Sequence, residues 1–363
     1  MQASSSGMSK RLLELLGVEH PILLAPMAGS AGADLAIAVA NAGGLGSLPC
    51  ALLTHERIRS EVDAIRRSSS RPLNLNFFCH TELPENTARE ARWKARLEVY
   101  YRELGIDASA PVVVPTRTPF NDALCDIVMD LRPEVVSFHF GLPDSALLEH
   151  VRSTGAKILS TATTVAEAVW LEQHGCDAVI AQGVEAGGHR GMFLTSDPAS
   201  QVGTMALVPL IVDAVSIPVI AAGGIADARG IAAAFALGAA AVQLGTAYLR
   251  CKESAASSVH RQALATASEE STAVTNVFTG RLARGIVNRL MRDLGAICAD
   301  APEFPHAAKA LAPLRARAEA SGSGDFSPLW AGQAVTFARE TDAGALTREL
   351  AEEAAALSRG RPR

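Results

Sequence analysis

Short apolar runs alternate with helical patterns along the first 250 residues, and this alternation constrains the fold more than any other feature of the sequence. Nearly all of the runs are continuously apolar and do not alternate apolar with polar positions. Continuous apolar strands joined by helices are typical of a parallel sheet with both faces covered. The runs that we predict as strands are residues 22–25, 45–48, 73–78, 135–138, 157–160, 178–182, 217–222 and 240–244.

Eight such units close most economically into a (β/α)8 barrel, so the predicted fold class is α/β with a TIM barrel. A doubly wound open sheet is the alternative. Such sheets usually carry a Gly-x-Gly-x-x-Gly turn after the first strand, where this chain has Pro26-Met27-Ala28-Gly29. The helices that we predict between strands cover residues 33–42, 89–104, 121–131, 164–174 and 203–215, with two more starting near residues 54 and 227.

The pattern of apolar residues changes after the eighth predicted strand. Residues 252–320 show helical patterns and no strand pattern, which predicts a smaller helical second domain inserted after strand eight. We expect residues 8–250 and 328–358 to form the barrel and residues 251–327 to form the lid or second domain. We also expect an extended link over 111–115, a hinge or loop tip over 321–324, a final helix over 342–358 that packs back on the barrel, and a basic tail over 359–363.

Composition excludes two classes of partner. The chain has 33 basic and 38 acidic side chains, a net charge of −5, and no basic stripe, so we expect no nucleic-acid binding. No apolar run approaches the roughly 18 to 20 residues of a membrane helix. Residues 1–7 lack the apolar segment of a signal peptide, and they are interpreted as a flexible leader. We therefore expect a cytoplasmic protein.

The six cysteines lie far apart and form no Cys-x-x-Cys pair, which predicts buried thiols in a reducing compartment. Cys79 and His80 are adjacent, but neighbouring positions on a strand point to opposite faces and make a poor chelate. We expect no metal site.

Glycines follow the last two predicted strands. Barrels often hold a phosphate between the loops after strands seven and eight, where backbone N–H groups point at the phosphate oxygens. Gly223-Gly224 and Gly245-Thr246 fit such a cradle, because glycine allows close approach and unusual dihedral angles. The alternative is that these glycines only form tight turns.

His189 lies on a glycine-flanked loop beyond the sixth strand, in a stretch that lacks bulky apolar neighbours. A histidine there can take a carbon-bound proton or hold an anion at neutral pH. Gln182 either contacts the polar edge of a heteroaromatic ring or caps the loop backbone. Arg190 is either a surface cation or a phosphate-side cation. His139 is either a second pocket residue or a satisfied core histidine.

Several catalytic groups are missing from the strand ends: there is no lysine for a Schiff base, no carboxylate pair, and no Gly-x-Ser-x-Gly. A barrel with a phosphate cradle, few charges and one histidine indicates that a bound cofactor performs the difficult chemistry.

Four stretches of the sequence resemble the FMN-dependent nitronate monooxygenases, formerly called 2-nitropropane dioxygenases, and class I in particular. They are residues 25–29 with 41–46, residues 74–80, residues 136–141, and residues 187–191. Residues 222–225 and 243–246 match the family's phosphate-binding end, and residues 330–333 match a stretch late in the family's sequences. The similarity covers about residues 10–358.

The resemblance implies a barrel with a helical domain closing over the flavin, and oxidation of alkyl nitronates or nitroalkanes by O2 to carbonyl compounds and nitrite. His189 would be the catalytic histidine, holding the nitronate or removing the α-proton of a nitroalkane. A role for His139 in substrate binding is a further expectation. FMN is expected at Met27, Asn76, Gln182, Gly187, Gly188, Gly223, Gly224, Gln243, Leu244, Gly245, Thr246 and Gln333.

Two other functions stay open. One is an FMN-dependent NAD(P)H reductase of the same superfamily, acting on an enoyl thioester or a quinone. The other is a non-enzymatic flavin-binding or sensory module. The expected partners are small molecules and O2, and the expected assembly is a monomer or a homodimer.

Overall fold

The computed structural model describes residues 5–107 and 117–358. Eight parallel strands form one sheet in the order β1-β9-β8-β6-β5-β4-β3-β2, which confirms the predicted strands. Leu45 joins the two end strands, because Leu24 N donates to Leu45 O and Leu45 N donates to Ile22 O, both at 3.0 Å. The sheet is thereby closed into a barrel. The strands are β1 (Ile22–Leu24), β2 (Gly46–Pro49), β3 (Leu73–Phe78), β4 (Val135–His139), β5 (Lys157–Ala162), β6 (Ala178–Gln182), β8 (Val219–Ala222) and β9 (Ala241–Leu244).

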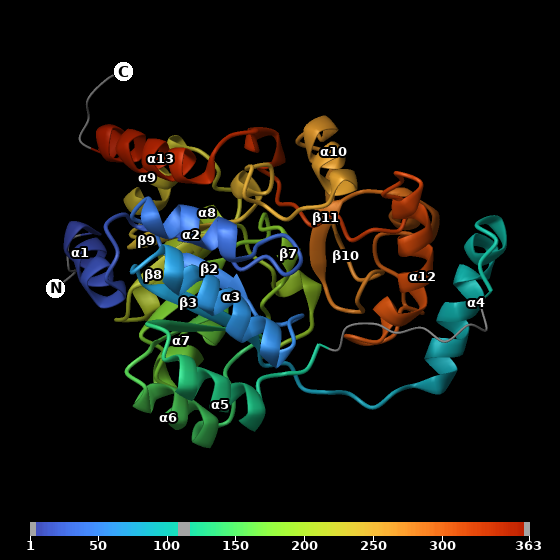
Figure 1. Ribbon diagram of the computed structural model, residues 1–363, viewed down its shortest axis with the longest axis horizontal. Coiled ribbons are helices and arrows are strands. Elements are labelled where there is room, and N and C mark those ends of the chain that lie inside the picture. The colour runs from blue at the N-terminus through green and yellow to red at the C-terminus, as the bar shows by residue number, and fades with distance from the viewer. Residues whose placement is uncertain (1–4, 108–116, 359–363) are drawn as a thin grey trace.

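Helices surround the barrel and bury the outer faces of the strands (Figure 1). Most start at a side chain that accepts a backbone N–H of the first turn, as Thr164 and Asp227 do. The sequence analysis did not predict α6, which fills the connection between β4 and β5. The surrounding helices are α2 (Ala33–Asn41), α3 (His55–Ser68), α5 (Asp122–Leu131), α6 (Ser145–Ser153), α7 (Val165–Gln173), α8 (Thr204–Ala214), α9 (Ala228–Ala236) and α13 (Ala343–Ser358).

Helix α1 (Ser5–Leu16) covers the amino-terminal end of the barrel. Its Leu12 and Leu16 pack with Leu23, Leu45 and Ile220 inside the barrel. The predicted leader is therefore helical from Ser5 onward, and its first four residues lie outside the described part of the chain. With this end closed, the opposite, carboxyl end of the barrel remains for a ligand (Figure 1).

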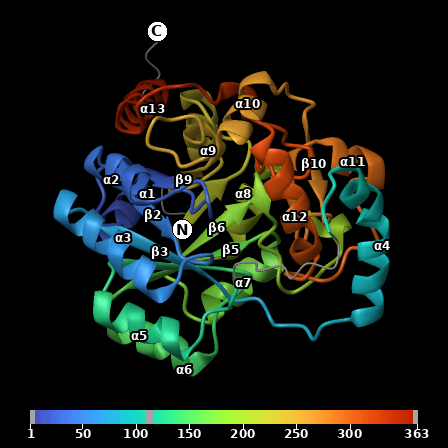
Figure 2. The ribbon, with the colours of Figure 1, turned by 45° about the vertical axis from the view of Figure 1, so that its right-hand side comes forward.

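A second unit lies beside the carboxyl end of the barrel and has its own apolar core. Helix α4 belongs to it, although this helix lies between β3 and α5 in the sequence: Trp93 and Tyr100 pack with Phe326 and Leu290. Figure 2 shows α4 against α12. The unit contains α4 (Thr87–Glu103), β10 (Thr272–Thr275), β11 (Ala283–Ile286), α11 (Arg289–Leu294) and α12 (Ala307–Ala320). Helix α10 (Ser258–Thr266) packs in a separate apolar cluster with Leu249, Ile286 and Val335.

The prediction that residues 252–320 lack strands was wrong. Strands β10 and β11 pair antiparallel, and β11 also pairs with β7 (Gly188–His189) from the barrel loop. These strands have only two to four residues and carry Thr272, Arg284 and glycines, so no apolar run marks them. The pairing fixes His189 opposite Ala283 and ties the barrel loop to the second unit.

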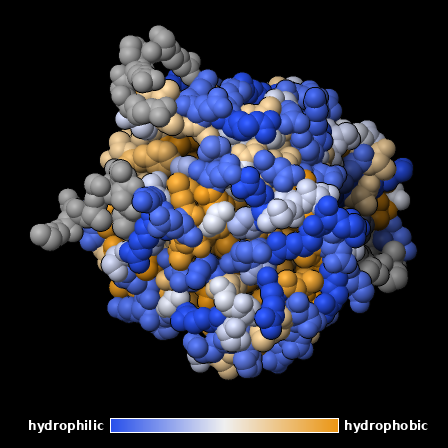
Figure 3. Space-filling model, turned by 60° about the vertical axis from the view of Figure 1, so that its left-hand side comes forward, coloured by the Kyte–Doolittle hydropathy of each residue, from blue (hydrophilic) through white to orange (hydrophobic). Residues whose placement is uncertain are grey.

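The remaining expectations concern the surface and the chain ends. All six cysteine thiols are free, and five of them are buried. Within the described residues, no helix is long and apolar enough to cross a membrane. The face shown in Figure 3 is a mosaic of hydrophilic residues with smaller hydrophobic patches. The predicted link over 111–115 and the tail over 359–363 lie outside the described residues. The described part of the chain also contains the short 3-10 helices η1 (Pro198–Ser200), η2 (Thr246–Tyr248) and η3 (Val335–Phe337).

Candidate active site

A cavity opens at the carboxyl ends of the barrel strands, and the second unit forms part of its wall. Side chains point alternately into and out of a barrel. The interior positions are apolar near α1, as at Leu23, and polar at the other end of the strands, as at Asn76, Gln182 and Gln243. The inward-facing polar residues are therefore concentrated where a ligand can reach them.

The two glycine turns form one end of the cavity. Gly223 has a φ of +113° and Gly224 a φ of +70°, a region that favours glycine. A Cβ at Gly223 would lie 3.0 Å from Ala186 N, so the close packing also requires glycine. Within the described residues, the N–H groups of Gly224, Gly245 and Thr246 donate no hydrogen bond. Unpaired N–H groups around a cavity are suited to bind a phosphate.

The neighbouring helix N-termini are already occupied by side chains. The carboxylate of Glu185 accepts the Thr204 N–H at 2.9 Å and the Thr204 hydroxyl at 2.8 Å, at the start of α8. Asp227 accepts the Gly230 N–H at 3.0 Å, at the start of α9. A phosphate at this end of the cavity would therefore bind at the glycine turns and not at these helix ends.

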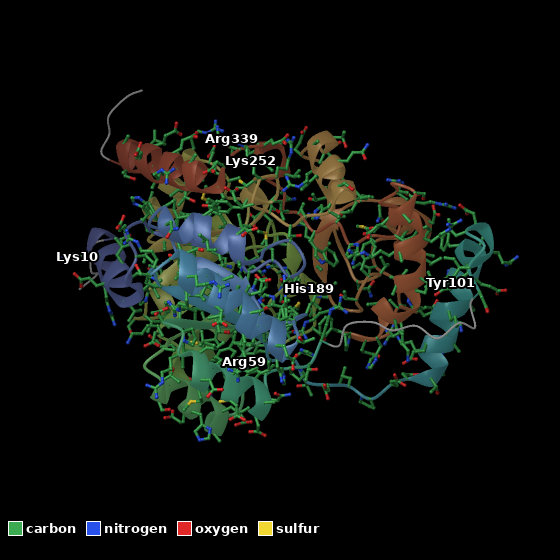
Figure 4. All side chains as sticks on the ribbon, viewed as in Figure 1. Lys10, Arg59, Tyr101, His189, Lys252 and Arg339 are labelled. Carbon is green, nitrogen blue, oxygen red and sulfur yellow. The ribbon has the colours of Figure 1, made fainter. Side chains whose placement is uncertain are left out.

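His189 lies at the junction of the barrel and the second unit (Figure 4). Aromatic rings surround its side chain. Its ring centroid is 5.4 Å from those of Phe304 and Trp330, and 6.2 Å from that of Phe78. The expectation of a loop without bulky neighbours was therefore wrong. The aromatic residues come from distant segments of the chain, so the local sequence around His189 could not indicate them.

The imidazole of His189 is held by one side chain and kept neutral by its surroundings. Its Nε2 lies 2.9 Å from the hydroxyl oxygen of Thr279, which is on the turn between β10 and β11. Burial lowers the pKa of His189 well below its ordinary value, and the positive charge of Arg117 lowers it further. At neutral pH the ring is therefore uncharged and able to accept a proton.

Two side chains hold the backbone of His189. Its carbonyl oxygen accepts from Gln182 Nε2 at 3.0 Å and lies 3.1 Å from His139 Nε2. Gln182 Oε1 also accepts the Gly191 N–H at 2.8 Å, so its amide caps the loop backbone. The His139 ring has its second nitrogen 3.2 Å from the Thr161 hydroxyl, and burial lowers its pKa to about 3. His139 thus lines the cavity and is also a satisfied histidine.

Arg190 is neither a surface cation nor a phosphate-side cation. It is buried, and its guanidinium donates to the carbonyl oxygens of Gln182 and Gly183 and to Gln201 Oε1 at 2.7–2.8 Å. Its role in the structure is to hold the end of β6 and the loop that follows it.

The structure brings most of the predicted site residues together and leaves two aside. The side chain of Gln333 is exposed, with Gly332 and Ala334 lining the cavity on either side of it, and the side chain of Leu244 lies in the barrel core. The predicted residues that line the cavity are Met27, Asn76, His139, Gln182, Gly187, Gly188, His189, Gly223, Gly224, Gln243, Gly245 and Thr246.

Arg117 was not predicted, and among the described residues it is the charged side chain that lines the cavity. No carboxylate of the described residues forms a salt bridge with it, and its guanidinium carbon lies 6.0 Å from the Phe304 ring centroid. Burial lowers its pKa, although not enough to neutralise it at physiological pH. A half-buried cation that lines a cavity and has no counter-ion among the described residues indicates an anionic ligand. No local motif marks Arg117.

Within the described residues, one group of side chains lies close enough together to hold a metal ion: Glu85, Glu90 and His306. It lies in the second unit, away from the cavity lining, and Lys309 already pairs with Glu85 at 3.5 Å.

Comparisons with known proteins identify the family to which the chain is similar. The model of the nitronate monooxygenase family matches residues 9–353. The nitronate monooxygenase of Pseudomonas aeruginosa is 41% identical over 348 residues, 95% of this chain and 99% of that protein. The nitronate monooxygenase of Paraburkholderia phytofirmans is 39% identical over 350 residues, 95% and 94% of the two chains.

Two solved structures are similar in fold. A nitroalkane oxidase from Streptomyces ansochromogenes superimposes with a TM-score of 0.86 at 38% identity and covers 96% of this chain and 99% of its own. FabK from Thermotoga maritima superimposes with a TM-score of 0.73 at 28% identity, covering 96% and 97%. The matches in sequence and fold span nearly the whole chain, which therefore belongs to the nitronate monooxygenase family.

Proposed function

We propose that this enzyme uses FMN to oxidise alkyl nitronates, and nitroalkanes, with O2 to carbonyl compounds and nitrite. The observation that carries the proposal is that one cavity is lined both by an uncharged histidine, His189, and by a cation without a carboxylate partner, Arg117. A nitronate is an anion, and a nitroalkane is a carbon acid. The cavity offers a cation for the first and a proton acceptor for the second.

The residues at the other end of the cavity fit FMN. Free N–H groups at Gly224, Gly245 and Thr246 suit its phosphate, and Met27, Asn76 and Gln243 line the space toward His189. When bound, FMN supplies the electron transfer between substrate and O2 that no side chain in the cavity can perform. The barrel segments, residues 8–250 and 328–358, would bind it, and residues 251–327 with α4 would close over it.

The chain's own residues position the substrate and exclude water. Phe78, Phe304 and Trp330 surround His189 with apolar surface, and this surface strengthens the attraction between Arg117 and an anion. Hydrogen bonds from the side chains of Gln182 and His139 to the backbone carbonyl of His189 fix the imidazole at the cavity wall. A neutral nitroalkane would lose its α-proton to this imidazole.

The likeness to FabK favours one alternative, an FMN-dependent NAD(P)H reductase acting on an enoyl thioester or a quinone. Both functions need the same flavin cradle, so the cradle does not separate them. They differ in the electron donor: a nitronate in one case and a reduced nicotinamide in the other.

The experiment that tests the proposal is anaerobic mixing of the purified protein with ethyl nitronate while the visible spectrum is recorded. We expect a yellow protein whose flavin absorption changes on mixing, and nitrite that appears when air is admitted. A yellow protein that is unchanged by nitronate but bleached by NADH or NADPH would support the reductase. A colourless protein that does not bind added FMN would overturn the cofactor assignment.

A further inference from the structure

The buried Thr279 hydroxyl lies between two polar partners. Thr279 is 2% exposed, and its Oγ1 is 2.9 Å from His189 Nε2 and 3.5 Å from the carbonyl oxygen of Arg281. Thr279 comes from the second unit, 90 residues after His189 in the sequence. A threonine hydroxyl has one hydrogen to donate and lone pairs that accept.

One arrangement of hydrogens gives both partners a hydrogen bond, with the bond to Arg281 O at its long limit of 3.5 Å. The Arg281 carbonyl can only accept, and among the described residues no other donor reaches it. In this arrangement the hydroxyl hydrogen points to the Arg281 carbonyl, and Thr279 Oγ1 accepts from His189 Nε2–H. A neutral imidazole carries one N–H, so this bond places the lone pair on Nδ1.

The His189 Nδ1 atom is the ring nitrogen left for a ligand. It makes no hydrogen bond to any described residue, and His189 lines the cavity. If the Thr279 hydroxyl pointed the other way, Nδ1 would carry the hydrogen and would present a donor to an anion. The direction of one hydrogen bond thus decides whether the resting histidine is a base or an anion-binding donor.

We propose that Thr279 is a positioning residue that keeps the proton of His189 on Nε2 and thereby makes Nδ1 the base for neutral nitroalkanes. The inference rests on the proposed function. In the step, the α C–H bond breaks, the proton moves to Nδ1, and the electron pair moves into the nitro group to give the nitronate. The imidazolium that forms keeps its Nε2–H bond to Thr279, which in turn donates to Arg281 O.

The first test is the tautomer of His189 in the holoenzyme, measured by long-range 15N–1H NMR on protein labelled at its nine histidines. The His189 signals are identified by their loss in His189→Asn. We expect the proton on Nε2 in the wild type and in Thr279→Ser, and a shift toward Nδ1–H in Thr279→Val. A wild-type proton on Nδ1, or an unchanged tautomer in Thr279→Val, overturns the proposal. If Thr279→Val does not fold, the wild-type spectrum still shows which ring nitrogen of His189 carries the proton.

The second test compares kcat/KM for nitroethane with that for ethyl nitronate. In Thr279→Val we expect the ratio to fall at least about tenfold, since general-base catalysis commonly contributes about 100-fold or more. Thr279→Ser should restore it. Thr275→Val removes another buried hydroxyl of the same hairpin, which bonds Val277 N and not His189, and should leave the ratio unchanged.

The outcomes separate this inference from the proposed function. A wild-type enzyme that oxidises neither compound contradicts the proposed function, and the NMR experiment still decides the tautomer. A wild-type enzyme that oxidises ethyl nitronate but not nitroethane contradicts the base assignment alone. An equal loss with both substrates in Thr279→Val would show a merely structural role for Thr279.

Discussion

The Nε2 atom of His139 lies 3.1 Å from the backbone carbonyl oxygen of His189, fifty residues further along the chain. A carbonyl only accepts, so Nε2 of His139 carries the hydrogen and its Nδ1 accepts from the Thr161 hydroxyl at 3.2 Å. Both nitrogens of His139 are thus engaged, and neither is free to bind a substrate. His139 lines the cavity, and we propose that it affects the substrate through the position of His189.

Replacing His139 with Phe should therefore weaken the fold and both reactions together. The His189 carbonyl keeps Gln182 as a partner, so we expect a loss of about 1 kcal/mol in the free energy of unfolding. The kcat/KM values for nitroethane and ethyl nitronate should fall by similar factors, because the whole imidazole shifts. Urea unfolding and steady-state kinetics measure the two effects. A selective loss with one substrate would show direct contact between His139 and that substrate.

His189→Asn removes the proton acceptor and keeps a polar side chain of smaller size. With nitroethane we expect kcat/KM to fall about 100-fold or more, the usual contribution of a general base. The flavin content of the purified protein should stay at the wild-type level, since the phosphate cradle is formed by other residues. Oxygen consumption and the ratio of flavin to protein absorbance are the measurements. Undiminished turnover of nitroethane would refute the base assignment.

Gly224→Asp should give a protein without bound flavin. The backbone of Gly224 has a φ of +70°, and a Cβ there would lie 3.3 Å from Glu185 Cβ. The carboxylate would also repel a phosphate. The control is Gly155→Asp, which carries similar strain at a φ of +90° in a turn with open space. The visible absorbance of both purified variants shows whether each binds flavin. A yellow Gly224→Asp protein would mean that the phosphate binds elsewhere.

The barrel could be predicted from the sequence, because a strand buried on both faces must be apolar at every position. Residues 22–24 and 219–222 show this plainly. The glycine turns could also be predicted, since Gly223 and Gly224 have dihedral angles that disfavour other residues. The second unit was harder, because its short strands carry polar residues and the pattern of a two- to four-residue strand is weak.

The walls of the site could not be predicted. Thr279, Phe304 and Trp330 reach His189 from segments at least 90 residues away, and Arg117 comes from the connection between α4 and α5. Their positions depend on how the second unit packs on the barrel, and a periodic pattern within one segment contains no information about that packing.

The buried histidines should make the protein sensitive to acid. Burial lowers the pKa of His80 and of His260 to about 4, whereas an unfolded histidine titrates near about 6.5. Below that value the unfolded chain binds protons that the folded chain does not, so stability falls as the pH drops from about 6.5 to 4 and is level above about 6.5. Urea midpoints at several pH values test this, and His260→Gln should show a shallower decline. A constant midpoint down to pH 4 would contradict the burial of these groups.

Arg117→Met tests the electrostatic part of the proposal. Removing the unpaired cation should raise KM for anionic ethyl nitronate about tenfold, the equivalent of one charge-assisted hydrogen bond. The KM for neutral nitroethane should change little. Because Arg117 also lowers the pKa of His189, the acid limb of kcat/KM for nitroethane should move to higher pH in the variant.

The matched control is Arg59→Met, which removes an exposed arginine paired with Asp130 on the outside of the barrel (Figure 4). It should change neither KM nor the pH profile, since water screens its charge. If Arg117→Met loses flavin and impairs both substrates equally, the arginine binds the cofactor and not the nitronate. If the variant retains flavin and its KM rises tenfold for ethyl nitronate alone, the substrate binds between Arg117 and His189.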